Sequence, residues 1–278
     1  MRPPLTYYGG KQLMAKEIVT LLPDHKIYCE PFFGGGAVFF EKHPSYLEVI
    51  NDTNDRLITF YQVLQENPEE LFNAINNTPH SESLSKLARE IYNRRIEHDD
   101  LGMAWAVWQM TNGNFTGSPH GGWKWDNGAS GSHTARVLAK KRTELTDVYY
   151  RRIQNVQISC RDALRVISDR DSIDTVFYLD PPYPGANQKH YSGYSFQDFF
   201  ALLDLLKTIK GKFILSNYWS QMLKYFIATN AWHFISKDVN IRIMNLNVNT
   251  YDNSRTEILL MNFKPPVMIA TEQKLKFA

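Results

Sequence analysis

The sequence predicts an α/β fold, in which a mostly parallel sheet carries helices on both faces and a mainly helical segment is inserted. Three observations support this prediction. Short apolar runs alternate with amphipathic runs over the first sixty or so residues, and the same alternation returns after residue 155. Between them, residues 68–110 carry apolar side chains at three- and four-residue spacing, which is typical of helices. Alternating strands and helices indicate a parallel sheet covered by helices.

The first part of the chain is expected to contain two strands, each of which leads into a helix. The strands are predicted at residues 26–30 and 46–51. The helices are predicted at residues 11–22, from Ala37 onward, and at residues 55–66. The first of these helices ends before Pro23, because proline cannot continue a helix.

The predicted insert covers residues 64–151 and divides the sheet domain into residues 1–63 and 152–278. Helical patterns cover residues 68–110 and 134–150 of this insert. Residues 111–133 between them are rich in Gly, Asn and Ser, with interleaved aromatic residues at Phe115, Trp123 and Trp125. A loop this long in a compact domain is usually functional or disordered, and the aromatic residues argue against disorder.

The last part of the chain returns to alternating strands and helices. Residues 173–179 form a near-continuous apolar run, as expected for a strand buried on both faces. Ser195 with Asp198 three residues later resembles a capping box that opens a helix over residues 196–209. Further strands are predicted at residues 156–160 and 212–217, the latter followed by a helix, and a closing antiparallel pair at residues 232–241 and 256–263.

Composition limits the classes of protein to which the chain can belong. Its 278 residues are 43% hydrophobic and 22% charged, which is ordinary for a globular protein that builds its core without disulfides. Cys29 and Cys160 fit a reduced, intracellular protein, and neither the cysteines nor the eight histidines show metal-ligand spacing, so no metal is expected. Without a signal peptide or an apolar span in the sequence, we expect a cytoplasmic location and no membrane contact.

Positive charge is concentrated in the insert, although the net charge of the chain is only +2. Residues 86–152 hold eleven Lys and Arg residues against seven Asp and Glu residues. Two interpretations remain open at this point. The cations could lie on solvated helix faces, or they could form a surface that meets phosphates.

A glycine-rich turn and an acidic residue suggest a cofactor site. In "EPFFGGGAVF", Gly34–Gly36 lie between a strand and a helix, where the backbone can approach a ligand closely. The spacing is not GxGxxG, so a dinucleotide fits poorly. Asp52 ends the next strand, at a position where an acidic residue commonly binds ribose hydroxyls. Asp52 could instead begin a helix, a role that Asn54 or Asp55 could also fill. Together these features favour a ribose-bearing cofactor without a pyrophosphate.

The stretch "YLDPPYPG" follows the most apolar strand and combines a carboxylate, two prolines and an aromatic ring. Each proline holds the residue before it extended and lacks an N–H group. Asp180 and the carbonyl group of Pro181 should therefore form a rigid pair of hydrogen-bond acceptors beside Tyr183. A planar amino group attached to a ring suits such a site, because its two N–H bonds meet the acceptors while the ring stacks on the tyrosine.

The ordered set of motifs resembles the Dam-type (alpha-group, D12 class) DNA adenine-N6 methyltransferases, which use S-adenosylmethionine. The matching segments are "YYGGK", "EPFFGGG", "DTND", "DPPY" and "LSNY", with a long target-recognition insert between the third and the fourth. The resemblance implies a Rossmann-like methyltransferase sheet. It also implies methyl transfer to N6 of a flipped-out adenine in double-stranded DNA. The sequence leaves the oligomeric state open, and we expect a monomer without an obligatory protein partner.

The resemblance also implies roles for individual residues. Asp180 and Pro181 would accept hydrogen bonds from the adenine amine, and Tyr183 would stack on the flipped base. The residues expected to line the cofactor pocket are Tyr7, Lys11, Phe32, Gly34, Gly36, Asp52, Asp162 and Asp180.

The stretch "TNGNFTG" resembles the part of the recognition domain that enters DNA. Phe115 would fill the space left by the flipped adenine, although it could also pack within a hairpin. The other predicted DNA contacts are Asn112, Asn114, Thr116 and Lys189, the last of which could equally lie in a solvated loop. The segment "SPHGGWKW" departs from the arginine-bearing hairpin of GATC-specific members, so the recognition sequence stays open.

Three other functions are compatible with parts of the pattern. A different planar amine could be methylated, such as cytosine N4, an RNA adenine or a protein glutamine amide, but those motifs usually begin with Ser or Asn. A non-catalytic nucleic-acid-binding module would have no need for Asp52 and Asp180 together. An oxidoreductase that uses NAD is disfavoured by the missing GxGxxG.

Overall fold

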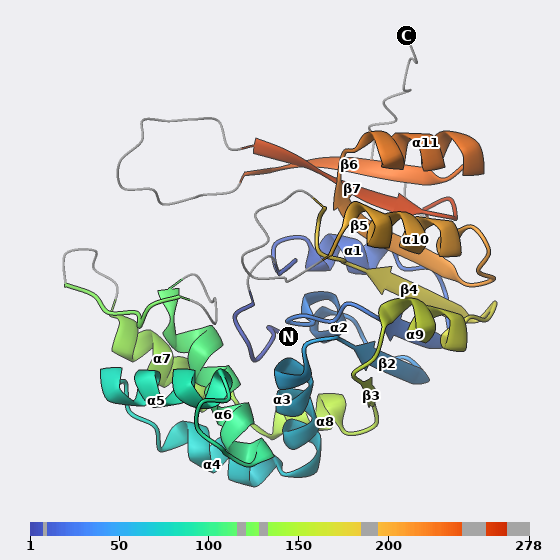
Figure 1. The fold of residues 1–278 in the computed structure, drawn as a ribbon. Coiled ribbons are helices and arrows are strands. Elements are labelled where there is room, and N and C mark those ends of the chain that lie inside the picture. The colour runs from blue at the N-terminus through green and yellow to red at the C-terminus, as the bar shows by residue number, and fades with distance from the viewer. Residues whose placement is uncertain (8–9, 116–120, 128–132, 185–193, 241–253, 266–278) are drawn as a thin grey trace. The chain divides into compact units, whose positions relative to one another are not determined.

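The computed structural model describes residues 1–7, 10–115, 121–127, 133–184, 194–240 and 254–265 (Figure 1). The chain divides into two compact units. Unit 1 contains residues 1–20 and 30–166, and unit 2 contains residues 21–29 and 167–278. The described residues form seven strands and eleven helices, which confirms the predicted α/β class.

Unit 1 contains two parallel strands and most of the helices. Strand β2 (Leu47–Asn51) pairs with β3 (Gln157–Ser159), with Val49 opposite Gln157. Both strands lie where the sequence predicts them. The helices of this unit are α1 (Ala15–Leu21), α2 (Ala37–Glu41), α3 (Asp55–Glu66), α4 (Pro68–Asn76), α5 (Glu82–Tyr92), α6 (Asp100–Gly113), α7 (Thr134–Glu144) and α8 (Asp147–Ile153). The last residue of α1 belongs to unit 2.

Helix α6 is the centre of the helical group that the figure shows together with α4, α5 and α7 (Figure 1). It packs against α3, α4 and α5, and its side chains are buried on nearly all sides. Trp108 and Met110 are examples, and both have almost no exposed surface. A helix that is apolar all round is expected to be buried, and the run "AWAVWQM" has this character.

Unit 2 contains five strands in the order β1-β4-β5-β7-β6. Strands β1 (Ile27–Glu30), β4 (Thr175–Leu179) and β5 (Lys212–Tyr218) run parallel, as predicted. Strand β7 (Ser254–Met261) lies between β5 and β6 (His233–Asn240) and is antiparallel to both, which confirms the closing antiparallel pair.

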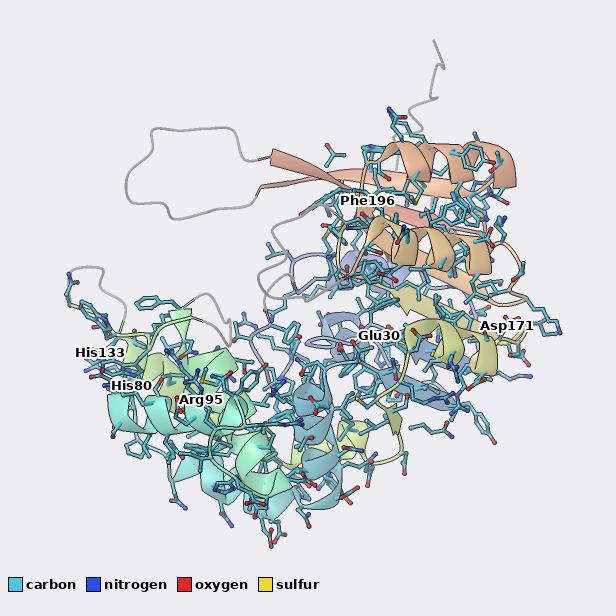
Figure 2. All side chains as sticks on the ribbon, viewed as in Figure 1. Glu30, His80, Arg95, His133, Asp171 and Phe196 are labelled. Carbon is cyan, nitrogen blue, oxygen red and sulfur yellow. The ribbon has the colours of Figure 1, made fainter. Side chains whose placement is uncertain are left out.

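Helices α10 (Phe196–Leu206) and α11 (Gln221–Asn230) lie side by side along this part of the sheet (Figure 1). Their contact includes Phe200 and Phe226, whose ring centroids are 5.6 Å apart. The capping box of Ser195 and Asp198 is present at the start of α10, where Phe196 is exposed (Figure 2). This motif therefore has the role that the sequence predicted.

Several helices differ from the predictions. Helix α1 begins at Ala15 rather than at Lys11, and α6 continues through Gly113 into the stretch predicted to be a loop. Residues 134–150 form two helices, because α7 ends at Glu144 and α8 begins at Asp147. Helix α9 (Ala163–Arg170) was not predicted, although Asp162 caps it through the N–H group of Arg165.

Candidate active site

The glycine turn, residues 31–36, has a backbone that other amino acids would not adopt. Gly34 and Gly36 have positive φ angles of 49° and 68°. A Cβ atom on Gly36 would clash with the Phe33 ring, and one on Gly35 would lie 2.8 Å from Cβ of Tyr7. The three glycines therefore permit a left-handed backbone and let the Tyr7 side chain pack directly on the turn. Two predicted cofactor residues, Tyr7 and Gly34, are thus neighbours.

Asp52 is bonded to the glycine turn. One carboxylate oxygen accepts a hydrogen bond from the N–H group of Gly34 at 2.9 Å, and the other accepts one from Asn54 at 2.9 Å. Asn54, not Asp52, is the N-cap of α3, because its side chain accepts from the N–H group of Leu57. Burial raises the pKa of Asp52, while the hydrogen bonds from Asn54 and Gly34 act in the opposite direction.

Asn51 is a buried residue that the sequence did not single out, and it fixes the surroundings of Asp52. Its amide donates to the carbonyl groups of Pro31 and Arg161 at 3.0 and 2.9 Å. Its side-chain oxygen accepts from the hydroxyl group of Ser159 and from the N–H group of Arg161. One side chain at the end of β2 therefore holds both the glycine turn and the segment that precedes Asp162. A polar residue at the end of an apolar strand is the signal that could have found it.

The remaining predicted cofactor residues have varied surroundings. Phe32 and Lys11 are half-buried, whereas Asp162 is exposed and caps α9. The hydroxyl group of Tyr61, which the sequence also did not single out, donates to the carbonyl group of Gly35 at 3.3 Å. Burial raises the pKa of Tyr61 well above its ordinary value, and Glu30, labelled in Figure 2, and Asp52 add to this effect.

The carboxylate turn, residues 180–184, follows β4 in unit 2. Strand β4 is buried along its whole length, and Pro181 is buried after it, whereas Asp180 is half-buried. The turn thus lies at the carboxyl end of a parallel strand, where α/β sheets bind their ligands. This is the location that the sequence predicts.

Tyr183 is held by two carboxylates and a second tyrosine. Its hydroxyl oxygen lies 3.2 Å from Oδ1 of Asp180 and 2.7 Å from Oε1 of Glu257. Its ring packs edge-to-face against Tyr218, with the ring centroids 4.5 Å apart. Burial and the negative charges of Asp180 and Glu257 raise the pKa of Tyr183 well above its ordinary value, so the hydroxyl group keeps its proton.

Two of the predicted DNA contacts at the end of α6, Asn112 and Asn114, are buried. The amide group of Asn112 is buried and bonds to Thr6, Lys141 and the carbonyl group of Pro4, so a contact with DNA would require these bonds to break. Asn114 is buried and faces the sulfur atom of Met110.

Phe115 is the exposed member of this group. Its side chain is 44% exposed, while its N–H group donates to the carbonyl group of Gly122. A second strand-like contact joins Asn114 to Trp123, and Trp125 two residues further on is exposed as well. Two exposed aromatic rings therefore flank a short backbone pairing at the end of α6.

Many of the cations in residues 86–152 bond to groups within the protein. The Arg152 side chain is 8% exposed, donates to Glu48 and lies over the Phe39 ring at 3.5 Å. Lys42 completes this network by bonding to Glu48. The other cations of this stretch with such bonds are Lys86, Arg89, Arg94, Arg95, Lys140, Lys141, Arg142 and Arg151.

Two predicted DNA contacts, Thr116 and Lys189, lie outside the described residues. Among the described residues, no group of three or more His, Cys, Asp or Glu side chains could hold a metal ion. None of the helices that the structure describes has the length and apolar character needed to cross a membrane.

Comparison with known proteins gives a family match over most of the chain. A family model described as D12 class N6 adenine-specific DNA methyltransferase matches residues 7–118 and 119–254. The match includes the glycine turn, Asp52, the carboxylate turn and the helical group around α6.

Three curated relatives have similar sequences. The type II methyltransferase M1.LlaDCHI of Lactococcus lactis subsp. cremoris is 26% identical over 245 residues, which cover 77% of this chain and 80% of the relative. A DNA adenine methylase of Vibrio cholerae serotype O1 is 27% identical over 74% of this chain and 76% of its own length. The DNA N-6-adenine-methyltransferase of Escherichia phage P1 is 29% identical over 69% of this chain, but only 25% of the phage protein is covered.

Proposed function

Because this chain belongs to the D12 class of N6 adenine-specific DNA methyltransferases, we propose that its carboxylate turn binds the target amine and its glycine turn binds the methyl donor. The enzyme transfers a methyl group from S-adenosylmethionine to N6 of adenine in DNA. The observation that most supports the assignment of the amine site is the position of Asp180 and Pro181, directly after the buried parallel strand β4.

The residues around the glycine turn fit S-adenosylmethionine. Asp52 offers a half-buried carboxylate for ribose hydroxyls, and the turn has a Cβ-free backbone against which Tyr7 packs. S-adenosylmethionine supplies an electrophilic methyl group on its sulfonium. Lys11, Phe32 and Asp162 are proposed to complete this site. Asn51 and Tyr61 would hold the turn in place through the carbonyl groups of Pro31 and Gly35.

The chemistry proposed for the carboxylate turn follows from the electronic structure of adenine. The lone pair of N6 is delocalised into the ring, so the amine is a poor nucleophile. Acceptors at both N–H bonds, from Asp180 and the carbonyl group of Pro181, pull the nitrogen toward a tetrahedral shape and free that lone pair. They also stabilise the positive charge that develops on nitrogen, and this preorganised electrostatic effect needs no covalent enzyme intermediate.

Adenine reaches these acceptors only after leaving the double helix, at a cost of a few kcal/mol in unstacking. The Tyr183 ring is proposed to stack on the flipped base and so to offset part of this cost. Phe115 is proposed to fill the space that the base leaves, because its ring is exposed at the end of α6. Asn112, Asn114, Thr116 and Lys189 remain proposed DNA contacts.

The division of labour along the chain is also a proposal. Residues 64–151 would recognise the DNA sequence, and residues 1–63 with 152–278 would bind the cofactor and catalyse the transfer. We propose that the enzyme acts on double-stranded DNA as a monomer, without an obligatory protein partner, in the cytoplasm. Light scattering of the purified protein, with and without a DNA duplex, tests the oligomeric state.

The D180A variant tests the proposed site. We expect it to lose methyl transfer to DNA while S-adenosylmethionine still binds, because Asp180 mainly serves the amine. Transfer is measured with labelled S-adenosylmethionine and unmethylated DNA, followed by digestion and identification of the modified nucleoside. Cofactor binding is measured by calorimetry.

The matched control is D204A, which removes an exposed carboxylate of α10 that pairs with Lys207. It should leave both measurements unchanged. Equal loss of transfer and of cofactor binding in D180A would contradict the role assigned to Asp180. Methylated cytosine among the products would contradict the choice of amine.

A further inference from the structure

Glu257 lies beside the carboxylate turn, and no motif pointed to it. It belongs to β7, which is hydrogen-bonded on both sides, to β5 and to β6. Its side chain is 6% exposed, and its Oε1 lies 2.7 Å from the hydroxyl oxygen of Tyr183. A carboxylate held this firmly in a sheet is well placed to fix the position of a neighbouring side chain.

The Tyr183 hydroxyl group has one proton and two carboxylates within reach. Glu257 is at 2.7 Å and Asp180 is at 3.2 Å, so the shorter and stronger hydrogen bond goes to Glu257. The raised pKa of Tyr183 means that this proton stays on the hydroxyl group throughout the working pH range. The hydroxyl group is therefore a permanent donor, and only its choice of acceptor can vary.

From this geometry we infer that Glu257 is a positioning residue for methyl transfer, which draws the Tyr183 hydroxyl proton away from Asp180. The Tyr183 hydroxyl proton then does not compete with the adenine amine for the carboxylate of Asp180. The inference rests on the proposed role of Asp180 as the acceptor for that amine. It adds a competition between the Tyr183 hydroxyl group and the adenine amine for Asp180, which the sequence "DPPY" alone does not reveal.

The same contact fixes the Tyr183 ring. The ring is held at its hydroxyl end by Glu257 and on one side by Tyr218, which meets it edge-to-face at an interplanar angle of 81°. Lys237 on β6 lies opposite Glu257 in the strand register. The ionisable groups around the Tyr183 hydroxyl thus include Asp180, Glu257 and Tyr178, with Lys237 across the strand from Glu257.

Removal of Glu257 has a specific consequence. In E257A the Tyr183 hydroxyl group keeps its proton, and Asp180 becomes the nearest carboxylate that can accept it. The substrate amine must then compete with an internal donor for the same oxygen. We expect kcat to fall about 10-fold or more, the size of one charge-assisted hydrogen bond, while the affinity for S-adenosylmethionine changes little.

A double-mutant cycle distinguishes this competition from a merely structural role. The variants are E257A, Y183F and E257A/Y183F, and single-turnover methylation of a DNA duplex gives the rate of transfer. If Glu257 only supports the fold or holds the Tyr183 ring, the double variant should be no faster than E257A. If it removes a competing donor, the double variant should be faster than E257A, by about threefold or more, because phenylalanine keeps the ring and has no proton to give.

The matched control is Y178F in the E257A background. Tyr178 also has a buried hydroxyl group on this sheet, but that group bonds to Ser216 at 3.0 Å. Its removal should not restore activity. E257M, which keeps the length of the side chain without an acceptor, replaces E257A if alanine at this position prevents folding, as judged by thermal unfolding.

A double variant no faster than E257A, or rescue by Y178F as large as that by Y183F, would overturn the inference. Unchanged kcat in both E257A and E257M would overturn it as well. The D180A measurement keeps this outcome separate from the proposed function. If D180A abolishes transfer and the double variant is no faster than E257A, only the role of Glu257 is lost; if D180A remains active, the amine site itself is wrong.

Discussion

The three glycines of the glycine turn are required for different physical reasons. Gly34 and Gly36 have left-handed backbone conformations, whereas Gly35 is required because the Tyr7 side chain lies against it. A larger residue would strain the backbone at the outer two positions and displace Tyr7 at the middle one. Individual atoms at this turn thus determine the shape of the proposed cofactor site.

The G36A variant tests this requirement. The positive φ angle and the clash of the new Cβ with the Phe33 ring should destabilise the protein by roughly 1–3 kcal/mol. Urea unfolding gives the free energy. The control is G122A, because a Cβ at Gly122 meets no atom within 4 Å and its φ angle is not positive. Equal stability of the two variants would argue against strain at the turn.

Asp52 should give the proposed cofactor site a pH dependence. The ionised carboxylate is the form that accepts from ribose hydroxyls, and burial raises its pKa, so this form is lost earlier on acidification than at an exposed aspartate. The affinity for S-adenosylmethionine should therefore fall as the pH is lowered through the raised pKa. In D52N the affinity should be low, with a shallower pH dependence. Calorimetric titrations between pH 8 and about pH 5 test this, and an equally steep fall in D52N would assign it to another group.

At the scale of elements, buried and half-buried polar side chains join segments that are distant in the sequence. Lys141 of α7 donates to Thr6 in the N-terminal segment and to Asn112 at the end of α6. Thr6 precedes Tyr7, which packs on the glycine turn. The helices proposed to read DNA and the segment proposed to bind the cofactor therefore share one hydrogen-bonded junction. Burial lowers the pKa of Lys141, since its charge is partly removed from water.

Replacement of Lys141 by methionine should destabilise this junction. Methionine keeps the aliphatic stem but leaves Thr6 and Asn112 without their shared donor, which should cost about 1–3 kcal/mol. Lys140 is the neighbouring control, because it is exposed and pairs with Glu144 four residues later. K140M should change stability by less than about 0.5 kcal/mol. Chemical denaturation compares the two variants, and equal effects would remove the special role of Lys141.

At the scale of the whole molecule, the positions of the charged side chains matter more for DNA binding than the net charge of the chain does. The net charge is only +2, and nine of the eleven cations in residues 86–152 already bond to groups of the protein. Those in exposed ion pairs can exchange their partner for a phosphate at little cost, whereas Arg152, whose side chain is 8% exposed, cannot. DNA binding should therefore depend on a few exposed cations.

Lys189, which lies outside the described residues, is predicted to contact DNA. The K189A variant should bind a DNA duplex more weakly, and the slope of log K against log salt should become shallower by about 1. Fluorescence anisotropy at several salt concentrations measures both. The control is K26A, which removes an exposed lysine that pairs with Asp174. The same affinity and slope in K189A and in the unmodified protein would exclude a phosphate contact at Lys189.

Local patterns predicted the strands and several helices well. The sequence "DRLITFYQVLQE" coincides with α3, and the capping box of Ser195 and Asp198 begins α10 as expected. These features depend on neighbours within one turn or one strand. The end of α6 was placed too early, because the side chains of Thr111 and Asn112 are buried and bonded to α6 itself and to the N-terminal segment. Long-range contacts of this kind leave no local signal.

The sequence by itself determined the order of the motifs and hence the family, because "EPFFGGG", "DTND" and "DPPY" combine residue types that the chemistry requires at fixed places. Only the tertiary structure decided which side chains support them. Asn51 bonds to a carbonyl group 20 residues away in the sequence, and Glu257 bonds to a tyrosine 74 residues away. Such partners are set by the pairing of strands and by the packing of side chains. The motifs contain the residues that are proposed to react, and the fold determines which other side chains hold those residues in position.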